Sequence, residues 1–231
     1  MTISWISALD NAGHFTMSMN QNRFSAHNLA ACPFFVLSVA CAGLEPLLTR
    51  CGSCTGRGIA DKPRALGVPL CRPGWTTLAD DGALAVDSSV PAAGVHEEAG
   101  QEGLDDEEVQ DAASSPASTP TQWPVDGTIE LPPVTPAALE QARDAAFAVT
   151  PGVAHILARV LTVRGIHGHY LIVAETLEAY AKADYWSSKT LEPQHQGLPP
   201  ILSFLGSQRF YWQQRPADAK DSKTVGLEHV E

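Results

Sequence analysis

The stretch Thr150–Ser187, which reads TPGVAHILARVLTVRGIHGHYLIVAETLEAYAKADYWS, decides the predicted fold. Its apolar residues recur at intervals of three and four, the spacing of the buried stripe of an amphipathic helix. Thr150-Pro151 is typical of a helix start, because threonine caps free N–H groups and proline loses no hydrogen bond there. We therefore predict one helix over about residues 151–164, ended by Gly165, and another over about residues 169–187. The stripes consist of Val153, Ile156, Leu157, Val160 and Leu161, and of Tyr170, Val173, Ala174, Leu177, Tyr180, Ala181 and Tyr185.

The same stretch is also compatible with a β-hairpin. Residues 157–174 would form two strands that turn around Gly165–Gly168. β-Branched side chains favour strands, and this segment holds Val160, Thr162, Val163 and Ile172. The Thr-Pro helix start favours the helical interpretation, and the hairpin is the alternative.

The flanking segments carry further start and turn signals. Thr135-Pro136 repeats the Thr-Pro start and predicts a helix over about residues 136–149. Residues 201–213 alternate around a Gly-Ser-Gln turn and predict a short hairpin. The sequence thus predicts a mainly α fold, in which residues 135–215 form a small, winged-helix-like domain of three helices plus a β-hairpin behind a loop-rich N-terminal region.

Composition divides the rest of the chain. We expect a disordered arm at 1–28, an apolar segment with a Cys-containing loop module at 29–86, an acidic Pro/Ser-rich linker at 87–134 and a disordered tail at 216–231. Eight acidic residues and no basic one lie in 97–111, and they account for most of the net charge of −11. No large basic block is present, so charge disfavours nucleic acid and anionic membranes as partners.

The segment Cys51-Gly52-Ser53-Cys54-Thr55-Gly56-Arg57-Gly58 has the form C-x-x-C-x-G-x-G. Two thiolates three residues apart can bind one metal from a tight turn, and glycines let the backbone curl toward the sulfurs. The eight residues resemble one repeat of the cysteine-rich zinc domain of DnaJ-type co-chaperones. That family uses paired copies and a His-Pro-Asp motif, and this chain has neither.

A complete zinc site here would need two further ligands. Cys41 and Cys71 are the candidates, so the predicted structural zinc site is Cys41, Cys51, Cys54 and Cys71. A redox dithiol at Cys51 and Cys54 is the alternative, which we disfavour because Gly56 and Gly58 oppose a helix after the first cysteine. A second metal candidate, formed by His155, His167, His169 and Glu175, is interpreted as polar residues near a helix–helix turn.

Arg209-Phe210-Tyr211-Trp212 interleaves aromatic rings with a cation, and we assign these residues to partner binding. No complete catalytic set can be assembled from the motifs, which favours a non-enzymatic protein and identifies no small-molecule substrate. We therefore predict a protein-interaction or accessory subunit of a larger assembly with a structural zinc knuckle. The alternatives are a nucleic-acid-associated zinc or winged-helix protein, disfavoured by the acidic helix at 169–187, and an exported protein.

The uncharged segment Leu29–Leu44 bears on location. Its sixteen residues are shorter than the roughly 20 that a membrane-spanning helix needs. Ala40-Cys41-Ala42 has the small residues of a signal-peptide cleavage site, so export through a segment ending near Ala42 is one interpretation. A buried apolar segment in a cytoplasmic protein is the interpretation we adopt.

Overall fold

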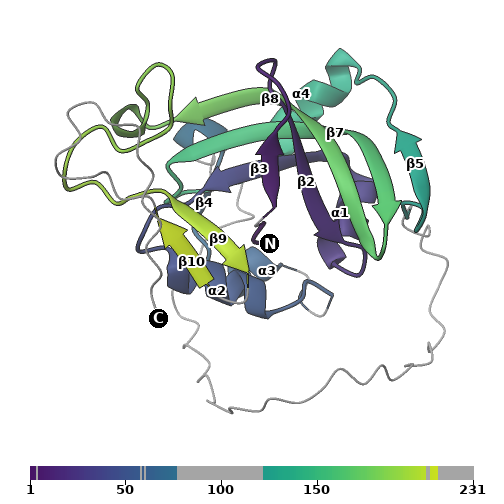
Figure 1. The fold of residues 1–231 in the computed structure, drawn as a ribbon, viewed down its shortest axis with the longest axis horizontal. Coiled ribbons are helices and arrows are strands. Elements are labelled where there is room, and N and C mark those ends of the chain that lie inside the picture. Colours follow the sequence, from purple (N-terminus) through teal and green to yellow (C-terminus); the bar gives the residue numbers. More distant parts are fainter. Residues whose placement is uncertain (4, 58, 60, 77–121, 207–208, 213–231) are drawn as a thin grey trace, which may run out of the picture.

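The computed structural model describes residues 1–3, 5–57, 59, 61–76, 122–206 and 209–212, and strands dominate it. A six-stranded sheet has the order β1-β2-β8-β7-β3, and β5 also pairs with β7 (Figure 1). Its strands are β1 (Ile6–Ala8), β2 (His14–Asn20), β3 (Phe34–Val39), β5 (Gly127–Glu130), β7 (Ala154–Ile166) and β8 (His169–Ala181). Two small antiparallel sheets pair β4 (Leu70–Cys71) with β6 (Ala148–Val149) and β9 (Leu202–Gly206) with β10 (Arg209–Trp212).

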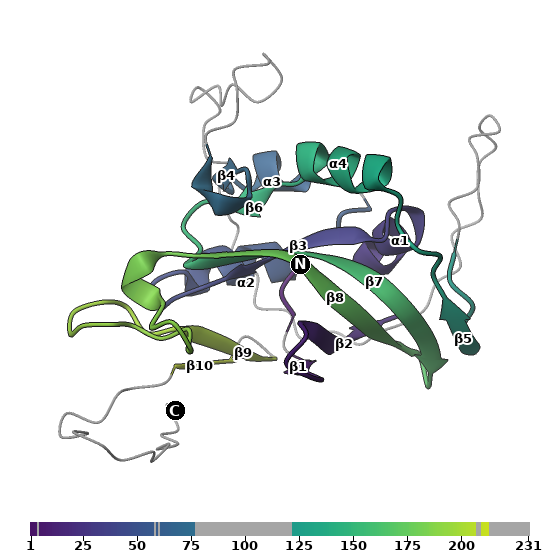
Figure 2. The same cartoon turned by 90° about the horizontal axis from the view of Figure 1, so that it is seen from above.

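Short helices flank these sheets. Figure 2 shows α4 on one side of the main sheet and the β9–β10 hairpin on the other. The helices are α1 (Phe24–Ala31), α2 (Glu45–Ser53), α3 (Lys62–Ala65) and α4 (Pro136–Ala145), with single 3₁₀ turns η1 (Pro73–Trp75) and η2 (Ala183–Tyr185). Among the described residues, no helix combines the length and the apolar character needed to cross a bilayer.

Most of the stretch from Thr150 to Ser187 is a long β-hairpin made of β7 and β8, so the prediction of a mainly α, winged-helix-like domain is wrong. β7 and β8 pair antiparallel and are joined by His167 and Gly168 alone. The φ angles of these two residues are 45° and 77°, and positive values at both positions characterise the tight turns that match the twist of paired strands. The hairpin alternative was therefore the better interpretation of this stretch.

Irregular pairing explains why β7 resembles a helix in sequence. The β7–β8 register shifts between Leu157 and Ala158 and again between Val160 and Thr162. The first shift leaves Leu177 of β8 unpaired and the second leaves Leu161 of β7 unpaired, and each breaks the alternation of its own strand. The bulge at Leu161 separates the buried Val160 from the buried Val163 by three positions, and with the buried Leu157 this spacing imitates a helical stripe.

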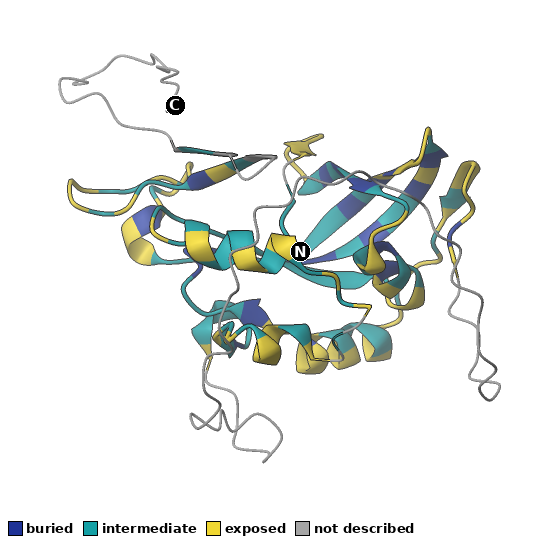
Figure 3. Cartoon of the chain, turned by 90° about the horizontal axis from the view of Figure 1, so that it is seen from below, coloured by how far each residue is buried: buried dark blue, intermediate teal, exposed yellow. Residues whose placement is uncertain are grey.

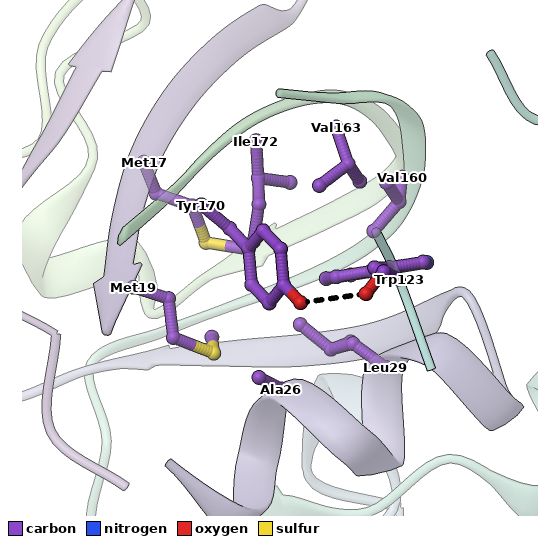
Figure 4. Packing of buried hydrophobic residues seen from close by; sticks show 9 residues of the cluster. All are labelled: Met17, Met19, Ala26, Leu29, Trp123, Val160, Val163, Tyr170 and Ile172. Carbon is purple, nitrogen blue, oxygen red and sulfur yellow. Dashed lines mark hydrogen bonds between the residues drawn. The ribbon is translucent and has the colours of Figure 1, made fainter. Parts of the chain in front are cut away.

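The main core lies between the sheet and α1. β2 alternates strictly, so that Phe15, Met17 and Met19 point inward, and α1 adds Ala26 and Leu29. Figure 3 shows that buried positions concentrate on the strands of this sheet. Figure 4 shows the cluster of Met17, Met19, Ala26, Leu29, Trp123, Val160, Val163, Tyr170 and Ile172, in which the Tyr170 hydroxyl donates to the Trp123 carbonyl oxygen at 2.9 Å. Residues 1–28, for which we expected a disordered arm, thus supply β1, β2 and the start of α1.

Two local predictions are confirmed. Thr135 caps α4, because its side-chain oxygen accepts a hydrogen bond from the Ala138 N–H at 3.2 Å. Residues 202–212 form the β9–β10 hairpin. The acidic part of the linker and the tail at 216–231 lie outside the described residues, and the proposed boundaries between the five segments stay a prediction.

Gly165 allows β5 to join the edge of β7. β3 pairs with residues 154–159 of β7 and β5 with residues 162–165, so one strand edge serves two partners. A Cβ atom built on Gly165 would overlap the carbonyl group of Val125, which is backbone and cannot rotate away.

Gly165→Ala is therefore expected to lower the free energy of unfolding by about 1–3 kcal/mol, the usual cost of overpacking. Gly52→Ala is the matched control, because Gly52 lies in α2 with only the Thr2 hydroxyl oxygen at 3.5 Å. Urea denaturation of both variants measures the difference. Equal stability of Gly165→Ala and the wild type would contradict the close approach.

His155 is buried on β7 with 0 % exposure, the one polar or charged side chain so buried among the described residues. Its Nε2 lies 3.0 Å from the Val149 carbonyl oxygen, and the Gly74 N–H donates to Nδ1 at 3.3 Å. The Trp75 ring stacks on it with centroids 4.3 Å apart. The ring is therefore a neutral tautomer that ties η1 and β6 to the main sheet. Burial is the main cause that lowers its pKa below the usual 6.5, and the Lys182 ammonium acts in the same direction.

Because the pKa of His155 is lower in the folded than in the unfolded protein, the unfolded protein takes up a proton first as the pH falls. The stabilisation of the folded protein by neutral His155 is thus fully present above pH 6.5. It is lost as the pH falls from 6.5 toward the lowered pKa. His155→Phe should cost about 1–3 kcal/mol, since the Gly74 N–H and the Val149 carbonyl lose their partner, and should flatten this pH dependence. His169→Phe, at an exposed position, is the control. Denaturation midpoints between pH 5 and 8, where ordinary histidines titrate, measure both effects, and an unchanged slope in His155→Phe would refute the assignment.

Candidate functional site

An open cavity of ≈ 1440 Å³ lies where β2 meets α1, against the C-terminal end of α2 and the loop that follows. This volume exceeds the range of about 300–1,000 Å³ that is common for small-molecule sites. The described residues that line it are Met1, Thr2, Ile3, Trp5, Ser18, Met19, Asn20, Asn22, Arg23, Phe24, Ser25, Leu48, Thr49, Cys51, Gly52, Ser53, Cys54, Thr55, Gly56, Arg57, Lys62, His169 and Phe204.

The lining of the cavity is positively charged, although the chain carries a net charge of −11. Arg23, Arg57 and Lys62 contribute cations, and none of the described lining residues is Asp or Glu. Burial and then the Lys62 ammonium lower the pKa of the Met1 amino group, because gathering cations away from water is unfavourable. An anionic ligand would relieve this repulsion.

The first turn of α1 points into the same space. Arg23 is the N-cap residue, and its side chain does not cap the helix. The first N–H groups of a helix lack partners within it, and the helix dipole places partial positive charge there. Ser25 adds a hydroxyl beside them. Together with the arginines, this helix start provides the donors that bind phosphate in proteins.

Two of the cations are held in place by backbone carbonyls. Arg57 Nη2 donates to the Asn22 carbonyl oxygen at 3.2 Å, which keeps the guanidinium beside the β2–α1 corner. Lys62 Nζ donates to the carbonyl oxygens of Cys51 and Cys54, both at 2.5 Å. Arg23 has an exposed side chain that makes no hydrogen bond or ion pair with the residues that the structure describes, so it can contact a ligand.

Aromatic faces complete the cavity. Trp5 is 73 % exposed and Phe24 is 38 % exposed, although both line the cavity. Exposed aromatic rings beside a concave surface are suited to stack on a planar ligand. The cavity therefore combines phosphate-binding groups with flat apolar surfaces.

The four cysteines predicted to bind zinc do not converge, and the zinc prediction is wrong. Cys71 is buried in β4, where its thiol lies 3.8 Å from the Ala148 carbonyl oxygen, and Cys41 pairs with Ile201. Cys51 is in α2 and Cys54 caps its C-terminal end, so these two form no isolated metal-binding turn. No group of three or more His, Cys, Asp or Glu residues among the described residues is placed to hold a metal ion.

Of the other candidate residues, only His169 is among the described residues that line the cavity. Arg209–Trp212 form β10, in which Phe210 packs on Phe204 with ring centroids 5.3 Å apart, and their role in partner binding stays a prediction. His167 and His169 lie at the tip of the main hairpin, away from His155 at the start of β7.

Sequence reasoning missed Arg23, Arg57 and Lys62. They belong to three segments and show no common motif, and Arg23 was placed in the predicted arm. The polar run Asn20-Gln21-Asn22-Arg23 before an apolar segment was a signal for a turn and a helix start that we did not use.

The fold, with this cavity in place, resembles solved flavoprotein structures. An FMN-binding protein from Thermus thermophilus, with bound 1-cyclohex-2-enone, matches at a TM-score of 0.50 and 15% identity, covering 91% of this chain and 75% of that one. An FMN-binding domain of a flavin reductase-like enzyme from Shewanella baltica matches at 0.50 and 13%, covering 94% and 80%. A flavoredoxin from Methanosarcina acetivorans gives 0.49 and 10%, with 96% and 80% covered. No protein-family model and no curated protein sequence matches the chain.

These similarities show a flavin-reductase-like, barrel-like β fold. They correct the prediction of a helical domain, and they leave the prediction of a zinc-containing accessory subunit without support. The two segments after Thr150 that were assigned to helices are β7 and β8 of the main sheet, and the segment assigned to a zinc module forms α2, α3 and β4.

Proposed function

We propose that the protein binds flavin mononucleotide in the cavity between β2, α1 and α2 and acts in electron transfer. The observation that carries this proposal is the cluster of Arg23, Arg57 and the α1 N-terminus beside exposed aromatic faces, on a flavin-reductase-like fold. The phosphate of FMN is a dianion and the flavin ring system is planar. One ligand would therefore match both the cationic groups and the aromatic faces of the cavity. When bound, FMN supplies two-electron donor and acceptor chemistry.

The residues of the chain would have separate tasks. Arg23 and Arg57 would bind the phosphate with charge-assisted hydrogen bonds, supported by the first turn of α1. Ser18 and Thr49, which also line the cavity, offer hydroxyl groups to the sugar-alcohol chain. Phe24 and Trp5 would cover the ring and keep water from it.

A cytoplasmic location fits this proposal. Cys32, Cys41, Cys51, Cys54 and Cys71 are all free thiols, as in a reducing compartment. Cleavage near Ala42 would remove β1, β2 and β3, which supports retention over export. Cell fractionation would test the location, and recovery of the chain outside the cytoplasm would refute it.

Titration of the protein with FMN and with riboflavin, followed by flavin fluorescence, tests the site. Arg23→Gln and Arg57→Gln should each weaken FMN binding by roughly 10-fold to 100-fold, the effect of losing a charge-assisted hydrogen bond of about 1.5–3 kcal/mol. Riboflavin lacks the phosphate, so its weaker binding should be nearly unaffected by either change. Arg143→Gln is the matched control, because Arg143 pairs with Glu140 and Glu178 outside the cavity.

Two results would contradict the proposal. One is an absence of FMN binding to the wild-type protein. The other is an equal affinity for FMN and riboflavin, because the cationic lining would then have no role in recognition.

A further inference from the structure

The Cys51–Cys54 pair is the motif that the flavin site leaves unexplained. Both thiols are free and half-buried, and both residues line the cavity. Residues three apart at a helix end share one side, with Cβ atoms about 5–6 Å apart. Cys54 has already left the helix, with φ −125° and ψ 148°, so the helix does not fix its Cβ atom, which must approach that of Cys51 to about 3.5–4.5 Å for an S–S bond to form.

Lys62 holds the turn that carries the pair. Its ammonium bridges the carbonyl oxygens of Cys51 and Cys54, each at 2.5 Å. These bonds involve the backbone and not the thiols, so the turn can keep its shape whether the sulfurs are reduced or joined. Lys62 also places a positive charge at the C-terminal end of α2, where the helix dipole carries partial negative charge.

The pair shares a wall with the proposed phosphate site. The loop after Cys54 packs closely on the first residue of α1: a Cβ atom on Gly56 would meet Phe24 Cδ1 at 2.7 Å. The two cysteines and the α1 N-terminus therefore border one continuous cavity. The other three cysteines do not line it.

We propose that Cys51 and Cys54 form a redox-active dithiol that exchanges two electrons with the flavin bound in this cavity, an inference that rests on the proposed function. In the oxidised protein the two sulfurs share an S–S bond. The reduced flavin gives up two electrons and two protons and is left oxidised. The S–S bond breaks, and each sulfur gains one electron and one proton to become a thiol. The reverse reaction oxidises the dithiol and reduces the flavin.

The pairing is tested first without flavin. Incubated in an oxidising glutathione buffer, the wild-type protein should lose two of its five free thiols and two hydrogens in mass. Peptide mapping should place the new bond between Cys51 and Cys54. Cys32→Ser, which removes an exposed thiol outside the cavity, should form the same bond, whereas Cys51→Ser and Cys54→Ser should not. A bond that joins any other pair, or none, would overturn the proposal.

The exchange is tested second, on the oxidised protein loaded with FMN in the absence of oxygen. After photoreduction of the flavin, its oxidised absorption band should return while two thiols appear for each flavin reoxidised. Cys32→Ser should behave likewise, and Cys51→Ser should hold its flavin reduced. Fluorescence titration of the same samples reports FMN binding. Binding without thiol release overturns the dithiol alone, whereas an absence of binding overturns both the dithiol and the proposed function.

Discussion

The pairing of β7 with β8 is the interaction on which the rest of the structure depends. β8 carries β2 on its outer edge, and β7 carries both β3 and β5 on the other. The two-residue turn at His167 and Gly168 sets the register of the hairpin, and the register decides which side chains face the core. Every other element of the main sheet takes its position from this pair.

Packing in the core fixes the position of α1 beside the cavity. Met17 and Met19 of β2 point inward beside Ile172 of β8. Ala26 and Leu29 of α1 pack against these side chains. With one face of α1 buried in this way, its first turn is held at the end of β2. Arg23, Phe24 and Ser25 therefore line the cavity without any contribution from a ligand, which is the preorganisation that a binding site requires.

The electrostatic character of the cavity arises from folding. Arg23, Arg57 and Lys62 come from the N-cap of α1, the loop after α2 and α3, and acidic residues are more frequent than basic ones along the chain. Their meeting at one concave surface creates a local positive field in a protein of net charge −11. An anion that enters the cavity would meet that field, and the cysteine pair at the end of α2 lines the same cavity.

The sequence by itself determined the short-range features: the Thr135 cap of α4, the β9–β10 hairpin and the closeness of Cys51 to Cys54. Each depends on residues within a few positions of one another, so local chemistry is sufficient to predict it. Only the tertiary structure decided that most of Thr150–Ser187 is a hairpin, because a bulge gave β7 a helix-like spacing of buried residues and strand partners more than 100 positions away stabilise it. It also decided the cavity, because cations that are distant in sequence become neighbours only when the sheet and α1 pack together.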